Sequence, residues 1–231
     1  MGIGATQLGS YTLRAPRCVA SVQTTLSMGN KEGQRKITIC TEKAEITPAP
    51  MVDPIVVVDY DPAWPDLFAT LRVPVAAALG DVAVAIEHVG STAVPGLAAK
   101  PIIDLDVAIR TETRLPEAIE RLACLGYAYE GDTGIPGRAA FAWPPRAVRH
   151  HLYVCILDSA EYRRHLLFRD YLRAQPDVTA AYAALKRQLA ARYRMQRDAY
   201  TEAKEPFVRA AMSRAEEWAR ITGWVVPERR R

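Results

Sequence analysis

The feature that most constrains this chain is a glycine turn between two apolar strands. Residues 86–106 read Ile-Glu-His-Val-Gly-Ser-Thr-Ala-Val-Pro-Gly-Leu-Ala-Ala-Lys-Pro-Ile-Ile-Asp-Leu-Asp. The β-branched, alternating patterns predict strands over 82–89 and 101–109, joined by the turn and a short helix. Side chains two apart on a strand point to the same face, so Asp104 and Asp106 are expected opposite the apolar face of the second strand. The segment therefore predicts a β-sheet with a polar site on one face.

The two aspartates suggest a metal site. Asp104 and Asp106 are expected to lie about 7 Å apart at their Cα atoms, on one side of the strand. Two carboxylates at this spacing repel each other, and a divalent cation relieves the repulsion. Mg²⁺ held by a few carboxylates and by substrate phosphates is usual where phosphoryl groups are handled. We therefore predict Asp104 and Asp106 as catalytic metal ligands and Mg²⁺ as the cofactor.

The turn before these aspartates suggests a phosphate site. Gly90 lets the backbone approach a ligand closely, and the Ser91 hydroxyl, with backbone N–H groups of the following helix, can hold phosphate oxygens. Lys100 precedes the aspartate strand, where its ammonium group either contacts phosphate or partly neutralises the two acids. His88 is a secondary candidate that either orients phosphate or metal, or is a buried histidine that steadies the turn.

The rest of the chain predicts an α+β fold: a mixed β-sheet flanked by helices, with a helical C-terminal part. Asp61-Pro62 predicts a helix over 62–79, which Pro74 should kink or split. A short helix is expected from Pro116 to Gly126. Further strands are predicted near 127–130, 139–143 and 151–157. A capping box at Asp158 and Glu161 then opens a helical region that continues to Trp218 with a break at Pro176-Asp177.

Composition divides the chain into three parts. Residues 1–50 lack hydrophobic periodicity and predict a disordered leader; 51–220 form the predicted domain, and 221–231 a basic tail. Ile55–Val58 reads as the first ordered strand, and the abrupt change in composition raises the hypothesis that Met51 is the native start. The net charge is −5 over 51–110 and +6 over 111–231. An acidic block followed by an arginine-rich block suits a metal and an anionic ligand that meet between them.

Several classes of protein are excluded or not expected. A run of about 18 uninterrupted apolar residues is absent from the sequence, so no membrane span is predicted. The four cysteines are far apart and lack C-x-x-C spacing, which favours reduced thiols in a cytoplasm over a zinc ribbon or a disulfide framework. The arginines at 229–231 have no interleaved aromatic residues, so nucleic-acid binding is not expected.

The Gly-Ser turn followed by Asp-x-Asp resembles the signature of the polymerase-beta-like nucleotidyltransferase superfamily. The sequence of residues 86–106 resembles that of one branch of the superfamily, the GrpB family of small bacterial proteins. The resemblance covers about residues 52–220 and continues in five further motifs: Tyr60-Asp61-Pro62-x-Trp64, Gly134-Ile135-Pro136-Gly137-Arg138, His151-Leu152-Tyr153-Val154, Phe168-Arg169-Asp170-Tyr171-Leu172-Arg173 and Tyr200-x-x-x-Lys204-x-x-Phe207.

The resemblance implies a nucleotidyltransferase fold that binds a nucleotide or another phosphorylated small molecule, with an unknown acceptor. Arg138, after its glycine turn, is expected either to contact phosphate or to cap a surface turn. Lys204 shares a helix face with Tyr200 and reaches phosphate if that helix borders the cleft. Arg169 and Asp170 are interpreted as a brace between helix and sheet.

One departure from the superfamily concerns a third carboxylate, which active members generally carry on a later strand. The corresponding strand here, residues 150–157, offers His150, His151 and Tyr153 but no acid. His151 is therefore a candidate base or metal ligand. The alternatives are a catalytically silent nucleotide-binding module and a partner-docking module associated with coenzyme A biosynthesis. The last rests on similar domains that are fused to dephospho-coenzyme A kinase in some bacteria.

Overall fold

A computed structural model describes residues 53–145 and 147–227 of the 231-residue chain. The predicted leader over 1–50, the hypothesis of a start at Met51 and the last four residues of the predicted basic tail lie outside the described residues. None of the described helices is both long enough and apolar enough to cross a membrane.

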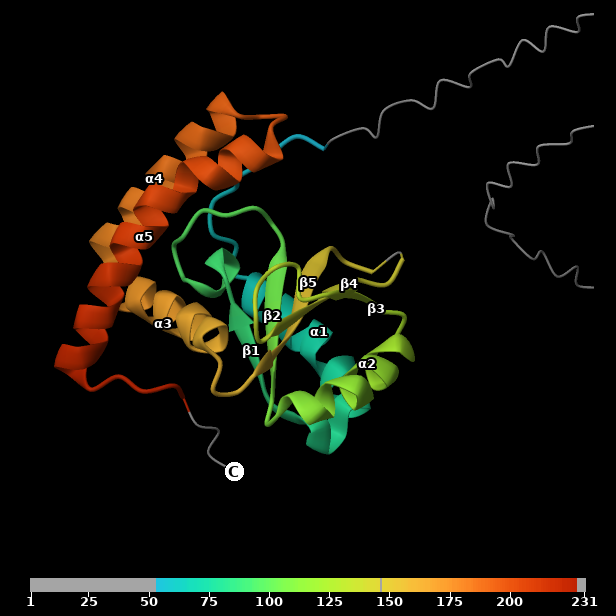
Figure 1. Cartoon of the computed structure of the whole chain (residues 1–231). Coiled ribbons are helices and arrows are strands. Elements are labelled where there is room, and N and C mark those ends of the chain that lie inside the picture. Colours follow the sequence, from blue (N-terminus) through green and yellow to red (C-terminus); the bar gives the residue numbers. More distant parts are fainter. Residues whose placement is uncertain (1–52, 146, 228–231) are drawn as a thin grey trace, which may run out of the picture. The chain divides into compact units, whose positions relative to one another are not determined.

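A mixed five-stranded sheet forms the centre of the fold (Figure 1). The strands lie in the order β1-β2-β5-β4-β3. The β2–β5 pair is parallel, and the other three pairs are antiparallel. Their bounds are Ala83–Val89 for β1, Ile103–Ile109 for β2, Ala128–Gly131 for β3, Arg138–Ala142 for β4 and His150–Ile156 for β5. The predicted α+β fold with a mixed sheet is confirmed.

Helices cover both faces of the sheet. Helices α1 (Trp64–Leu79) and α2 (Leu115–Ala123) pack on the face that carries Leu105 and the other apolar side chains of β2. Helix α3 (Ala160–Ala174) lies on the opposite face, where Tyr162 and Leu166 pack against Ala108 and other small residues. The alternation of β2 predicted from sequence therefore separates an apolar face from the face that carries Asp104 and Asp106.

The C-terminal part is helical, as predicted. Helices α4 (Pro176–Arg192) and α5 (Arg197–Thr222) run side by side beyond α3 (Figure 1). They pack on α3 and on the Val94–Ala98 loop, where the rings of Tyr182 and Phe207 stack 4.9 Å apart. Ordered packing continues past residue 220, because the Trp224 indole N–H donates a 3.1 Å hydrogen bond to Asp170 of α3.

Two local predictions about backbone are wrong. Ile55–Val58 is no strand: Val58 forms a single bridge with Ala99, and the Ile55 amide donates to the Arg194 carbonyl instead of to a neighbouring strand. Pro74 does not split α1, which continues through it to Leu79. Pro74 is exposed, so water can satisfy the carbonyl that the missing N–H leaves free.

The start of α3 also differs from the prediction. Ser159, not Asp158, is the N-cap, because its hydroxyl accepts a 3.2 Å hydrogen bond from the Tyr162 amide. Glu161 does not close a capping box. Its carboxylate instead accepts two hydrogen bonds of 2.8 Å from Arg164, one turn further along the helix.

Candidate functional site

The Gly90 turn lies directly against the Asp104 carboxylate. The antiparallel β1–β2 register pairs Val89 with Asp104, so the turn that follows β1 reaches the start of β2. Gly90 has φ +69°, and a Cβ atom added there would lie 2.1 Å from Asp104 Oδ2. Only glycine accommodates both the backbone angle and this approach. The short helix predicted after the turn is a single 3-10 turn, Ser91–Ala93.

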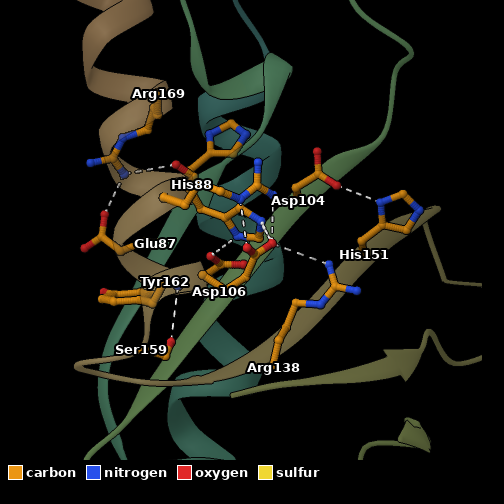
Figure 2. Close-up of polar contacts among 12 residues, drawn as sticks. Glu87, His88, Asp104, Asp106, Arg138, His151, Ser159, Tyr162 and Arg169 are labelled. Carbon is orange, nitrogen blue, oxygen red and sulfur yellow. Dashed lines mark hydrogen bonds and ion pairs between the residues drawn. The ribbon is translucent and has the colours of Figure 1, made fainter. Parts of the chain in front are cut away.

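His151 is the partner of Asp104. The parallel β2–β5 register places the two residues side by side, and 2.6 Å separate His151 Nδ1 from Asp104 Oδ1 (Figure 2). A carboxylate only accepts hydrogen bonds, so Nδ1 carries the hydrogen and Nε2 is the nitrogen that Asp104 does not engage. The strand on which the resemblance to active nucleotidyltransferases would place a third carboxylate thus presents an oriented imidazole.

Asp106 lies deeper than Asp104 and is fully buried. His165 of α3 contacts it, with 2.7 Å between Nδ1 and Asp106 Oδ2, and the other nitrogen of His165 lies 2.9 Å from Glu161 Oε1. Burial opposes a charged imidazole, but the hydrogen bonds to the two carboxylates prevail and raise the pKa of His165 to about 9. Burial raises the pKa of Asp106, against the hydrogen bond from His165.

Sequence reasoning missed both His165 and the role of Glu161. The available signal was their i,i+4 spacing, which places both side chains on the same face of a predicted helix. That face meets the sheet, which only the tertiary packing reveals. Hydrogen bonds from Arg164, and then from His165, lower the pKa of Glu161 despite its burial, so this carboxylate carries the charge that the buried imidazole needs.

Most of the predicted site residues line one cavity of about 290 Å³. The predicted residues among its walls are Gly90, Ser91, Lys100, Asp104, His151 and Lys204. The helical part adds residues that sequence reasoning did not select, of which Arg164, His165, Tyr182, Lys186 and Tyr200 carry polar groups. The cavity therefore joins the Gly-Ser turn and Asp104 on the sheet side to lysines on the helical side.

Arg138 does not line this cavity. It pairs with Cys155 across β4 and β5, toward the end of β5 remote from His151. Its guanidinium lies 4.4 Å from the centre of the Tyr153 ring and donates to Thr133, and it borders a separate cavity of about 400 Å³. The structure thus does not bring Arg138 together with the other predicted phosphate-binding residues.

His88 lies on the other face of the sheet, where it pairs with Leu105. Its ring stacks on Phe68 of α1, and Nε2 lies 3.0 Å from the Thr92 hydroxyl. That hydroxyl donates to the Ile102 carbonyl, so it accepts the hydrogen bond from His88. Burial lowers the pKa of His88 to about 4, so the ring is neutral. The arrangement matches the alternative of a buried histidine that steadies the turn.

Arginines of α3 hold the turn in place. Arg169 is 6% exposed and donates to the Glu87 carboxylate at 2.8 Å and to the His88 carbonyl at 3.1 Å (Figure 2). It also pairs with Asp170 at 2.7 Å, and Arg173 donates twice to the Ala93 carbonyl. The predicted brace between helix and sheet is confirmed. Its hydrogen bonds reach both ends of the Gly90 turn, at the His88 and Ala93 carbonyls.

The carboxylates of Asp104 and Asp106 could bind a Mg²⁺ ion only if other ligands completed its coordination shell. Asp106 Oδ1 is buried without a hydrogen-bond partner, which is the kind of oxygen that a cation satisfies. Within the described part of the chain, however, no group of three or more His, Cys, Asp or Glu side chains is placed to hold a metal. Mg²⁺ commonly takes one or two carboxylates and completes its shell with water and phosphate oxygens. Asp104 and Asp106 therefore suit a Mg²⁺ ion that arrives with a phosphorylated ligand.

The structure thus packs a Gly-Ser turn against an Asp-x-Asp strand in a mixed sheet with helices on both faces, the arrangement that the resemblance to the nucleotidyltransferase superfamily implies. The sequence model of one family, described as GrpB protein, matches residues 54–214. The chain belongs to the GrpB family.

Known relatives agree with this assignment. The crystal structure of conserved protein GrpB from Enterococcus faecalis is 34% identical, with a TM-score of 0.65, and the match covers 71% of this chain and 99% of that one. The UPF0157 protein YqkA of Bacillus subtilis is 35% identical over 159 residues, which are 69% of this chain and 46% of YqkA. A protein named dephospho-CoA kinase in Mycolicibacterium paratuberculosis is 32% identical over 74% of this chain and 48% of its own length. The chain thus spans about half the length of these last two relatives.

Proposed function

We propose that this protein binds a nucleotide, or a similar phosphorylated small molecule, with Mg²⁺ in the cavity between Asp104 and the lysines of the helical part. The observation that carries the proposal is the convergence of three lysines, the Gly90-Ser91 turn and Asp104 on one cavity. Ammonium groups and a serine hydroxyl suit phosphate oxygens, while the carboxylate suits the cation that accompanies them. A bound Mg²⁺ would neutralise phosphate charge next to Asp104.

His151 supports a transfer reaction at this site. Asp104 orients the imidazole, and the free Nε2 is suited to take a proton from an acceptor hydroxyl. We propose that His151 serves as the general base where superfamily members use a third carboxylate, in transfer of a nucleotidyl group to an acceptor not yet known. The contribution of the protein is then positioning and charge stabilisation.

A catalytically silent binding module is the second candidate, and the environment of Asp106 favours it. His165 occupies one oxygen of the buried carboxylate, and Asp106 is not among the residues that line the cavity. The relatives named dephospho-CoA kinase add a third candidate, a module that docks on such a kinase. Gel filtration of this chain mixed with a purified dephospho-CoA kinase tests the third candidate, which separate elution of the two proteins would exclude.

Asp104→Asn tests the proposed site by calorimetry with ATP in the presence and absence of Mg²⁺. We expect Mg²⁺ to strengthen binding of ATP to the wild type and to have little effect on Asp104→Asn, because the substitution removes the charge that holds the cation. Asp177→Asn, at an exposed acid in the first turn of α4, is the matched control and should behave as the wild type. Equal responses of wild type and Asp104→Asn to Mg²⁺ would contradict the proposal.

His151→Gln separates transfer from binding. We expect Mg-ATP affinity to change little, while label from [α-³²P]ATP incorporated into acceptors of a metabolite extract falls about 100- to 10,000-fold, the usual contribution of a general base. If the wild type binds Mg-ATP but transfers no label to any acceptor, the silent module is supported and the role of His151 as a base is wrong.

A further inference from the structure

The lysines of the folded part are confined to one place. Between residues 53 and 227 the sequence contains three lysines among many arginines, and all three line the 290 Å³ cavity. They come from separate elements: Lys100 precedes β2, Lys186 is on α4 and Lys204 is on α5. Arginine forms the buried brace of Arg169 and exposed ion pairs such as Arg163–Glu216, and the one arginine that lines the cavity, Arg164, is paired with Glu161. The cavity-lining cations without a carboxylate partner are therefore amines among the described residues.

Lys186 is the most deeply placed of the three. It is 3% exposed, and its Nζ atom is buried without a hydrogen-bond partner among the described residues. The nearest ring is that of Tyr182, whose centre lies 4.5 Å from Nζ, and Lys204 lies over Tyr200 in the same way at 4.6 Å. A buried amine that is left unpaired is unfavourable, so the fold retains it at a cost to stability.

The charges around Lys186 do not compensate it. From its own helix comes Arg187, which is paired with Asp59. The sheet contributes Asp104 and His151, the segment before β2 contributes Lys100, and α3 contributes Arg164 and His165. Helix α5 contributes Arg197, Lys204 and Glu205, and Tyr182 and Tyr200 add their hydroxyls. Asp104 is engaged by His151. Burial, followed by the charge of Lys204, lowers the pKa of Lys186 to about 7. Burial and the charge of Lys100 lower the pKa of Lys204 to about 8.

We infer that Lys186, together with Lys100 and Lys204, forms a clamp for a chain of two or more phosphates, and that this ligand enters with uptake of protons. The inference rests on the proposed function and specifies its ligand. One phosphate or carboxylate would satisfy one or two amines, whereas a phosphate chain presents charge to all three. Lysine suits the task better than arginine because an amine can shed its proton while the cavity is empty, and guanidinium cannot.

The proton uptake has a definite sign. An anion favours the charged amine, so binding raises the pKa of Lys186 and of Lys204. Because burial lowers the pKa of Lys186 to about 7, part of the Lys186 side chains lack the proton near neutral pH and must gain it from solvent when the ligand binds. Affinity should therefore fall as the pH rises from 7 to 9, over the range in which the empty cavity loses its protons.

Lys186→Met tests the clamp, with Arg187→Met as the control on the same helix. Calorimetry without Mg²⁺ compares ATP, ADP, AMP and inorganic tripolyphosphate, in two buffers of different ionisation enthalpy. We expect ATP and tripolyphosphate to bind the wild type more tightly than AMP does, and Lys186→Met to lose about 10- to 100-fold of that affinity. The variant should also take up fewer protons than the wild type on binding at pH 7. Arg187→Met, whose exposed side chain pairs with Asp59, should match the wild type.

A second readout separates binding from a structural role. Lys186→Met should raise Tm in the absence of ligand, because methionine removes an unpaired buried amine and keeps the apolar stem. A lower Tm would mean that Lys186 supports the fold and would overturn the inference. So would equal affinity of Lys186→Met and Arg187→Met for ATP, although ATP binding itself would then still support the proposed function. Tripolyphosphate binding that depends on Lys186, without binding of any nucleotide, would support the clamp and contradict the proposed function. No binding of either ligand would overturn both.

Discussion

Gly90→Ala is expected to abolish Mg-ATP binding and to destabilise the fold. The alanine Cβ would lie 2.1 Å from Asp104 Oδ2, so the carboxylate or the turn must move. Movement of Asp104 also breaks its 2.6 Å contact with His151. The φ of +69° with ψ of −167° belongs to a region that is essentially restricted to glycine and costs alanine about 1–3 kcal/mol, and the overpacking adds about 1–3 kcal/mol. Urea denaturation measures the stability, and calorimetry measures the binding.

Gly96→Ala is the control for the backbone angle. Gly96 also has a positive φ, +78°, but a Cβ atom there meets nothing within 4 Å. This variant should lose only the 1–2 kcal/mol or so that the left-handed conformation costs, and it should bind Mg-ATP as the wild type does. If the two variants lose equal stability and both bind, the close approach of turn and carboxylate is not required.

Arg169→Met is expected to produce the largest loss of stability, about 3–5 kcal/mol, as for buried ion pairs that lose one partner. Arg169 donates to Glu87, Asp170 and the His88 carbonyl from a position that is 6% exposed. Methionine keeps the length of the side chain but removes the donor to Glu87 and to the His88 carbonyl, while Asp170 keeps the hydrogen bond from Trp224. The free energy of unfolding from urea titration gives the value directly.

The matched control for this variant lies one and a half turns earlier on the same helix. Arg163 forms a bidentate ion pair with Glu216, with contacts of 2.6 and 2.8 Å, but both side chains are about half exposed. Exposed pairs typically contribute about 0.2–1 kcal/mol, so Arg163→Met should be nearly neutral. A loss at Arg163 equal to that at Arg169 would show that burial is not what gives the brace its strength.

The sheet side of the site was predictable because its signals are local. Strand periodicity placed Asp104 and Asp106 on one face, and Gly90 at the end of the preceding strand predicted the turn beside them. The neighbour of Asp104 depended on which strand pairs with β2. The resemblance to the superfamily directed attention to the strand that carries His151, and the parallel β2–β5 register confirms the pairing.

The site residues on the helices were harder to predict, because the sequence pattern of a helix does not show which other element each of its faces packs against. Lys186 is one residue from the exposed Arg187, and only the packing of α4 on α3 separates their environments. His165 gave no sign that it would meet Asp106, 59 residues away in the chain. Arg138 is a different case: its glycine turn suggested the cleft, but its guanidinium lies over Tyr153 and 4.0 Å from Glu161, and it does not line the cavity.

The arrangement of α4 and α5 has a consequence for how the molecule holds together. These helices rest on α3 and on the Val94–Ala98 loop, yet their amines face a carboxylate that belongs to β2. A polyanion bound together with its cation would connect the sheet directly to α4 and α5. The ligand would then complete the tertiary structure as well as occupy it, and hydrogen exchange in the outer helices would slow when the cavity is filled.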